Sequence, residues 1–251
     1  MPSASRPAVG TAPALSPVTR PSTVDLITVE LRNAIYSGAL RVGSGLREIE
    51  MARQLGVSRG AFREAAQRLV AEGIVVATPG RGLSVRTIGR DGIRPLYTAR
   101  TMVETTAARL AVDRASEQQV AAVRSAHDAL VQAEAAHDAL RVGAADLAVH
   151  WELVAASGNA WLQQWMSTLI VEVRIASFTV SDEYTVRTDA AESHAPLVEL
   201  LEARDADALE AAIRENLDDA VMRLLAPDAV GVQTLEEPRP LPAPRLEPLD
   251  R

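Results

Sequence analysis

Residues 55–73 read LGVSRGAFREAAQRLVAEG, and this stretch decides how the first third of the chain is expected to fold. A Gly-Val pair predicts a tight turn, Ser58 is a good N-cap, and Gly73 stands where a helix would end. At about 100° per residue, one face of this helix collects the apolar side chains Phe62, Ala65 and Leu69. The stretch therefore predicts a turn followed by an amphipathic helix with one buried face.

The other faces of this helix carry arginines. Arg59 and Arg63 lie about 40° apart near its start, whereas Arg68 points to a different side. Arginine binds phosphate or the guanine edge with two hydrogen bonds, and the first turn of a helix has exposed N–H donors. The small residues Gly60 and Ala61 would let the backbone approach DNA closely. Two interpretations are open: an ordinary solvated face, or a helix that enters the major groove.

The composition excludes several classes of protein. Of the 251 residues, 47% are hydrophobic, which supports packed cores, and the absence of cysteine excludes disulfides and thiolate metal sites. No stretch approaches the roughly 18 consecutive apolar residues of a membrane helix. The start of the chain, with five prolines before Val24, does not resemble a signal peptide. We therefore expect a soluble cytoplasmic protein without a membrane partner.

Charge is distributed unevenly along the chain. The net charge is −7, yet residues 20–90 contain 11 arginines and only 6 acidic residues, whereas residues 91–225 contain 11 arginines and 22 acidic residues. There is no lysine. A basic first part joined to an acidic second part indicates that the first part binds a polyanion and the second has another task.

The chain is expected to be mainly α-helical and to consist of four parts. These are a disordered tail (1–21), a domain of three helices and a β-hairpin (22–90), an all-helical domain (91–226) and a Pro-rich disordered tail (227–251). The first three helices are predicted at 23–36, 47–55 and 59–72. Six more are predicted at 93–115, 117–140, 143–156, 160–180, 187–203 and 206–224.

The hairpin is predicted from two short β-branched runs in IVVATPGRGLSVRTI, on either side of Pro79 and Gly80-Arg81-Gly82. A basic hairpin tip beside a candidate reading helix resembles a wing that reaches the minor groove or the DNA backbone. This favours the DNA-binding interpretation over the solvated face.

The stretch AIYSGALRVGSGLREIEMARQLGVSRGAFREAAQRLVAEGIVVATPGRGLSV closely resembles the winged helix-turn-helix of GntR-type bacterial transcription regulators. Their pattern I..G.l.pG..L.E..LA..lGVSR.pvREAL.rL..eGlv is matched in order along it. The resemblance implies a winged helix-turn-helix of three helices and a β-hairpin wing. It implies DNA contacts from Ser58, Arg59, Gly60, Ala61, Arg63, Gly80, Arg81 and Gly82.

Two departures from the family pattern concern the operator sequence rather than the fold. Many members have Thr-Pro or Thr-Thr after the Val-Ser-Arg triplet, where this chain has Gly60 and Ala61. Many also have a basic DNA-contacting residue between two acids on the second helix, and here that residue is Ile49.

In the second half, Asp146 and His150 are four residues apart and share one face of a predicted helix. A carboxylate and an imidazole at that spacing can hold a divalent ion. Taken by itself, the spacing is more typical of a surface pair or a buried hydrogen bond than of a metal site.

The order of motifs in this half resembles the all-helical, FCD-type effector domain of the FadR subfamily of GntR regulators, and six helices resemble its VanR-like branch. The metal site of such domains has one Asp and three His. The resemblance places the first two ligands at Asp146 and His150, the third at His194, and the fourth at Asn216. Because Asn is a poorer ligand than imidazole for Zn, Ni or Mn, the alternatives are a weaker divalent metal or direct hydrogen bonds to an effector.

The resemblance also implies effector-binding arginines. Arg100 and Arg174 lie on helices that line the pocket in the family, and Arg187 starts the next helix. An arginine fork suits a carboxylate, although Arg100 could instead pair with Glu104 one turn later. Trp151, Trp161 and Trp165 are expected in the core or in a dimer interface.

Together these observations predict a homodimeric transcription regulator, without enzyme activity, that binds a palindromic operator in double-stranded DNA. A small organic acid would control its DNA affinity. Repression is the default expectation, and activation is left open. The alternatives are a metal-dependent sensor and a helical metal hydrolase with a DNA-binding appendage, although no candidate for a water-activating base is present.

Overall fold

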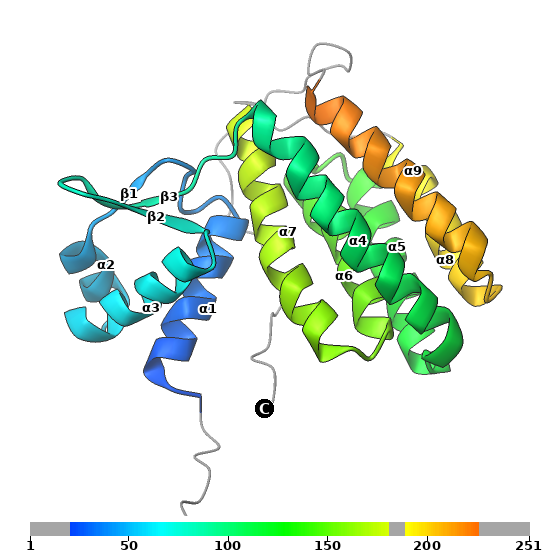
Figure 1. Cartoon of the computed structure of the whole chain (residues 1–251), viewed down its shortest axis with the longest axis horizontal. Coiled ribbons are helices and arrows are strands. Elements are labelled where there is room, and N and C mark those ends of the chain that lie inside the picture. Colours follow the sequence, from blue (N-terminus) through cyan, green and yellow to red (C-terminus); the bar gives the residue numbers. More distant parts are fainter. Residues whose placement is uncertain (1–20, 181–188, 226–251) are drawn as a thin grey trace, which may run out of the picture.

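The computed structural model describes residues 21–180 and 189–225, which form nine helices and three short strands (Figure 1). Arg187 and the predicted tails, apart from residue 21, lie outside the described residues. A small domain of α1–α3 and β1–β3 lies beside a larger domain of α4–α9 (Figure 1). The fold is mainly α-helical, as predicted.

The small domain is a winged helix-turn-helix. Its helices and strands are α1 (Thr23–Tyr36), β1 (Gly45–Leu46), α2 (Glu48–Gln54), α3 (Arg59–Ala71), β2 (Val75–Thr78) and β3 (Gly82–Val85). The strands form an antiparallel sheet in the order β1-β3-β2, in which Gly45 pairs with Ser84 and Val76 also pairs with Ser84. The wing is therefore the hairpin of β2 and β3 with one short added strand.

Two helices of the small domain, α1 and α3, start at residues whose side chains cap free backbone N–H groups. At α1, Ser22 and Asp25 form a capping box, in which each side chain binds the backbone N–H of the other residue. At α3, the Ser58 hydroxyl accepts from the N–H of Ala61 at 3.2 Å. The predicted buried face of α3 is confirmed, because Phe62, Ala65 and Leu69 are all 0% exposed.

Within the described residues, the larger domain contains six helices, as predicted. They are α4 (Arg90–Arg114), α5 (Glu117–Ala135), α6 (Ala139–Ala156), α7 (Ala160–Val180), α8 (Ala190–Glu202) and α9 (Ala206–Leu225). Helix α4 packs against α6, α7 and α9, and helix α5 packs against α6 and α8.

The prediction of one helix over 117–140 was wrong at its end. The chain turns at 136–138, where His137 takes a left-handed conformation with φ of 53°. The Asp138 side chain then accepts from the N–H of Arg141 and caps α6. A new helix therefore starts at residue 139, four residues earlier than predicted.

The two domains contact each other through α1 and α7 (Figure 1). The buried Arg174 of α7 donates from Nε to the carbonyl oxygen of Tyr36 at 3.2 Å. Its guanidinium lies over the Tyr36 ring, 5.2 Å from the centroid, and over the Phe178 ring at 4.8 Å. Outside this cluster, Arg86 forms an ion pair of 2.8 Å with Glu172.

No helix among the described residues is long and apolar enough to cross a membrane.

Candidate nucleic-acid interface and Asp/His cluster

The start of α3 is an exposed, basic surface. Ser58, Arg59 and Gly60 are exposed, and Ala61 is half-buried. Arg59 forms no ion pair with any residue that the structure describes, so its guanidinium is available to a ligand. The turn before α3 places these residues at the outer edge of the domain, as the sequence predicts for a reading helix.

Arg63, one turn later, is held in place by an acidic residue of α2. Its Nη2 lies 2.7 Å from Glu48 Oε2, and its Nε donates to the same carboxylate at 3.2 Å. The hydrogen bond from Arg63 is the largest cause of a lowered pKa at Glu48, and the nearby charge of Arg59 adds to it. The side chain of Arg63 is still 60% exposed. Glu48 therefore orients this guanidinium without covering it.

The prediction that Arg68 points elsewhere is confirmed. Its guanidinium lies 2.6 Å from Asp25 of α1 and 3.4 Å from Glu64. Arg68 thus joins α3 to α1 and takes no part in the basic surface at the start of α3.

The tip of the wing is formed by Gly80, Arg81 and Gly82. Both glycines have positive φ, 76° and 82°, which an L side chain adopts only with strain. Arg81 between them is exposed, and its N–H donates to the carbonyl oxygen of Thr78 at 3.0 Å. The tight turn therefore presents one arginine at the end of the hairpin.

Replacing Gly60 tests whether the backbone of α3 approaches DNA. A Cβ at this position would meet only the Ser58 hydroxyl, at 4.0 Å, so the folded protein has room for it. Because alanine favours helix over glycine by about 0.5–1 kcal/mol, Gly60→Ala is expected to keep or raise the melting temperature. It should lower DNA affinity if phosphate or base edges pack against this backbone. Unchanged DNA affinity would show that the backbone at residue 60 is not close to DNA.

In the larger domain, three of the predicted ligand residues come together. Asp146 and His150 project from α6, and His194 projects from α8. His150 Nε2 lies 3.1 Å from His194 Nε2, which lies 3.4 Å from Asp146 Oδ1. One ligand atom from each residue falls within 4.8 Å of the other two. The helices thus bring together side chains that are up to 48 residues apart in the sequence.

The hydrogen bonds of the two histidines determine which ring nitrogens carry protons. His150 Nδ1 lies 2.6 Å from Glu104 Oε2, and His194 Nδ1 lies 2.7 Å from the carbonyl oxygen of Ala190. Because a carboxylate and a carbonyl oxygen only accept, both Nδ1 atoms are donors. In neutral rings, both Nε2 atoms then present lone pairs to each other. A proton or a cation between them removes the repulsion.

The distances fit a metal ion. Two imidazoles that bind an ion at about 2.1 Å hold their nitrogens about 3.0 Å apart at a right angle and about 3.4 Å apart at a tetrahedral angle. The observed separation of 3.1 Å between His150 and His194 lies in this range. Asp146 supplies a carboxylate oxygen on the same side, and Glu104 orients His150 as carboxylates commonly orient ligand histidines. The donor set therefore suits a divalent ion of the Zn, Ni or Mn type.

Glu104 was expected only as a helical partner of Arg100. It accepts from Arg100 Nε at 2.5 Å through one oxygen and from His150 through the other. Burial by itself raises the pKa of Glu104, but the charge of Arg100 and the contacts of His150 outweigh it and hold this pKa below its usual range. Glu104 is therefore an ionised, fully buried bridge between Arg100 and His150 of the Asp/His cluster.

Arg100 is 1% exposed and adjoins the same cluster. Its Nη2 is buried without a hydrogen-bond partner among the described residues. Burial acts to lower its pKa, but the charges of Glu104 and Asp146 raise it overall. Arg100 thus pairs with Glu104 and still offers a buried donor, so both interpretations of this residue from the sequence are compatible with its surroundings.

The remaining predicted residues lie around the cluster or away from it. Asn216 of α9 is 7% exposed and donates from Nδ2 to the carbonyl oxygen of Ser193, the residue before His194. Arg174 instead contacts Tyr36 and Phe178 at the domain contact. The structure thus joins Asn216 to the backbone beside His194 and gives Arg174 a place between the domains.

Two of the three tryptophans are not core residues. Trp161 and Trp165 on α7 are 69% and 55% exposed, so of the two expected places, the core or a dimer interface, the structure excludes the core for both. They are four residues apart on one helix face, which leaves them available for an interface.

Comparison with known protein families gives the class of protein. The family described as "Bacterial regulatory proteins, gntR family" matches residues 23–85, and the FCD domain family matches residues 95–219. The chain belongs to the GntR family of transcription regulators and carries an FCD domain.

Individual relatives agree with this assignment. The chain is 31% identical over 193 residues to the "Probable D-xylose utilization operon transcriptional repressor" of Paenarthrobacter nicotinovorans, covering 77% of this chain and 83% of that protein. It is also 31% identical over 169 residues to the "Nta operon transcriptional regulator" of Aminobacter aminovorans, covering 66% and 78%.

Solved structures share the fold. Escherichia coli McbR/YncC superposes with a TM-score of 0.74 at 21% identity, covering 82% of this chain and 98% of that one. A GntR regulator from Rhodococcus sp. RHA1 superposes with a TM-score of 0.72 at 25% identity, covering 81% and 97%.

Proposed function

We propose that this chain is a ligand-responsive repressor that binds an inverted-repeat operator as a homodimer, and that a small organic acid in the α4–α9 domain controls its DNA affinity. The observation that carries the proposal is the pairing of two sites in one chain. One is the exposed basic start of α3, and the other is the buried Asp/His cluster with Arg100. We assign residues 22–90 to DNA binding and residues 91–226 to effector binding and dimerisation.

DNA binding is assigned to the start of α3 and to the wing. Arg59 is available for a base edge or phosphate, and Glu48 holds Arg63 in an exposed position. An arginine oriented by a carboxylate can present its remaining N–H donors to guanine. Arg81 at the wing tip would contact the minor groove or the backbone.

A divalent metal is assigned to Asp146, His150 and His194. The two Nε2 lone pairs at 3.1 Å and the adjacent carboxylate support this assignment. A bound divalent ion would supply a Lewis-acidic position for an effector carboxylate. Arg100 Nη2 would donate to the same carboxylate, because it is buried and has no partner in the described part of the chain.

Replacing Asn216 tests the ligand set. The variant Asn216→His supplies an imidazole where the related metal sites have one, so it is expected to bind Zn²⁺ more tightly than the wild type. Elemental analysis and competition with a chromophoric chelator measure the change. His150→Ala is the matched control and should lose the metal. If Asn216→His binds no more metal than His150→Ala, the assignment of Asn216 to this site is wrong.

The homodimer is assigned to the face of α4 and α7. These helices pack against each other, and they carry three exposed large apolar side chains, Met102, Trp161 and Trp165. Tryptophan is enriched in protein interfaces because it buries a large apolar area when a partner covers it. A two-fold dimer would also match the symmetry of an inverted repeat.

The double variant Trp161→Glu/Trp165→Glu is expected to be monomeric at micromolar concentration. A dimer of this variant would bury two carboxylates from each chain, and removing these charges from water costs more free energy than the interface gains. Sedimentation velocity measures the mass. Val131→Glu is the control, since Val131 is also an exposed apolar residue, at 44%, but lies on α5. A double variant that sediments as a dimer would contradict the proposed interface.

The coupling between the two sites is assigned to Tyr36. Its hydroxyl donates to the carbonyl oxygen of Ala144 at 3.4 Å, and Ala144 precedes the ligand Asp146 by two residues on α6. Its own carbonyl accepts from Arg174. A shift of α6 on effector binding would therefore reach the end of α1 and change the placement of the DNA-binding domain. An effector acts only through its different affinity for the two placements.

Selection from random duplex DNA tests the proposed function. Full-length protein is expected to enrich an inverted repeat, and affinity for it should fall linearly with salt on logarithmic axes because phosphate contacts release counterions. A metal sensor, which the Asp/His geometry also favours, would show a change in DNA affinity with Zn²⁺ alone. A library without a common sequence after selection would contradict the regulator itself.

A further inference from the structure

One exposed apolar side chain lies beside the start of α3 in the proposed DNA-binding surface. Ile49 on α2 is 66% exposed, although the buried residues of this domain include every isoleucine of α1. Leaving an isoleucine in water forgoes the stabilisation that burial would give. At a binding surface, such an exposed side chain can regain this stabilisation by contact with an apolar group of the ligand.

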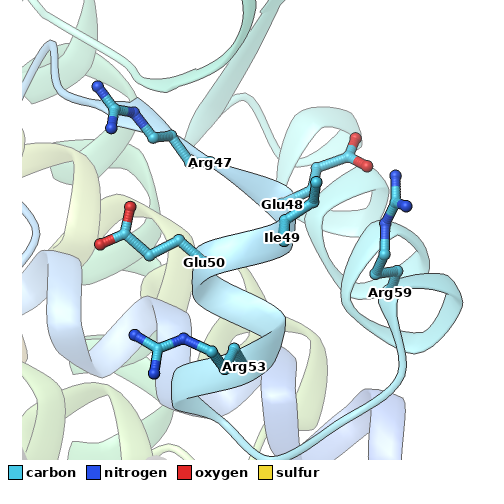
Figure 2. A pocket seen from close by; sticks show the side chains of 6 residues that line it. All are labelled: Arg47, Glu48, Ile49, Glu50, Arg53 and Arg59. Carbon is cyan, nitrogen blue, oxygen red and sulfur yellow. The ribbon is translucent and has the colours of Figure 1, made fainter.

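Ile49 lines a concavity of about 520 Å³ between α2 and the start of α3. Figure 2 shows its six lining residues, with Arg59 of α3 reaching toward Glu48 of α2. The lining consists of three arginines, two glutamates and Ile49: Arg47, Glu48, Ile49, Glu50, Arg53 and Arg59. A ligand that contacts Arg59 here therefore also comes close to Ile49.

The chemistry of the Ile49 side chain excludes a phosphate as its partner. The side chain has no hydrogen-bond donor and no charge, so a phosphate in the concavity would be bound by the arginines that line it and not by Ile49. It also cannot bind the guanine edge, which requires donors. In the major groove, the apolar group that remains is the C5-methyl of thymine.

We propose that Ile49 contacts a thymine methyl in each operator half-site, next to the base pairs reached by Arg59, and so selects thymine at that position. The proposal rests on the proposed function, in which the start of α3 enters the major groove. It also gives a role to the departure from the family pattern, because an isoleucine in place of a basic residue exchanges a hydrogen-bonding contact for an apolar one.

Deoxyuridine tests the contact one methyl group at a time. In the operator obtained by selection, each thymine pair related by the two-fold axis is replaced in turn by deoxyuridine, and the affinity is measured by fluorescence anisotropy. At one position, wild-type protein is expected to lose about fourfold in affinity for each half-site, the equivalent of about 0.8 kcal/mol per buried methyl.

Variants at residue 49 assign the effect to this side chain. Ile49→Ala should bind the thymine and deoxyuridine operators with nearly equal affinity at the sensitive position. Ile49→Arg should shift the preferred base there from thymine to guanine in a repeated selection. Leu26→Ala is the matched control, because Leu26 is also an exposed apolar residue of this domain, at 57%. Leu26 follows Asp25, which binds Arg68 on a different side of α3 from Arg59.

The outcomes separate this inference from the proposed function. If selection yields no inverted repeat, both are wrong. If it yields one and wild-type protein binds every deoxyuridine operator as well as the parent, the thymine contact is wrong and the regulator stands. A loss that persists unchanged in Ile49→Ala assigns the methyl to another residue and also overturns the inference.

Discussion

Arg59→Ala and Arg63→Ala are each expected to lower affinity for the selected operator by about tenfold to a hundredfold. Arg59 is exposed and without an ion-pair partner among the described residues, so it contributes no ion pair to the stability of the folded protein. Arg63 is exposed as well, and its one carboxylate partner, Glu48, holds it toward the surface. Both variants should therefore keep the wild-type melting temperature. Anisotropy titrations with operator and with scrambled DNA measure the change.

The two DNAs tell base contacts from phosphate contacts. Replacing an arginine that contacts a base lowers the affinity for the operator alone. Replacing an arginine that binds phosphate lowers the affinity for both DNAs equally and reduces the slope of the salt dependence by about one. Arg68→Ala is the control from the same helix, since Arg68 binds Asp25 and Glu64. Unchanged operator affinity in both Arg59→Ala and Arg63→Ala would show that this face of α3 does not read DNA.

Glu104→Gln is expected to destabilise the protein by about 3–5 kcal/mol, because it leaves the buried guanidinium of Arg100 without its ion-pair partner. Arg100 is 1% exposed and Glu104 is 0% exposed, so water cannot replace the lost partner. The glutamine amide can also rotate its NH₂ toward His150 Nδ1, which would disturb the orientation of that ring. Urea unfolding followed by circular dichroism measures the change.

A double-mutant cycle makes this prediction specific. Arg100→Met/Glu104→Gln removes the buried cation together with its partner and should recover part of the stability lost in Glu104→Gln alone. If the double variant is destabilised by the sum of the losses in Arg100→Met and Glu104→Gln, the two side chains are not coupled. A wild-type urea midpoint for Glu104→Gln would contradict the buried bridge altogether.

The elements of the fold were largely predictable because local signals agreed with the tertiary structure. The apolar spacing of α1 and its glycine stop gave the observed bounds, Thr23–Tyr36. The end of α5 was missed because no Gly or Pro marks it, and His137 takes the left-handed conformation that glycine usually supplies. The two-residue strand β1 was also missed, because its pairing with β3 depends on tertiary contacts rather than on a local pattern.

The candidate site was predictable only where one helix carries the residues. Asp146 and His150 share a face of α6 at a spacing visible in the sequence, whereas His194 came from the family resemblance alone. The bridge from Glu104 to His150 joins residues 46 positions apart, so no local pattern indicates it. Arg174 was expected beside the effector because no local pattern indicates its distant contacts, and the structure places its hydrogen bond to Tyr36 at the contact with α1.

The most direct test of the central claim is native mass spectrometry of the full-length protein mixed with the selected operator duplex. The account predicts one complex with two chains per duplex and one divalent ion per chain, and loss of the ions but not of the dimer in His150→Ala. A complex of one chain per duplex, or no complex at low salt, would contradict a dimeric regulator that binds an inverted repeat.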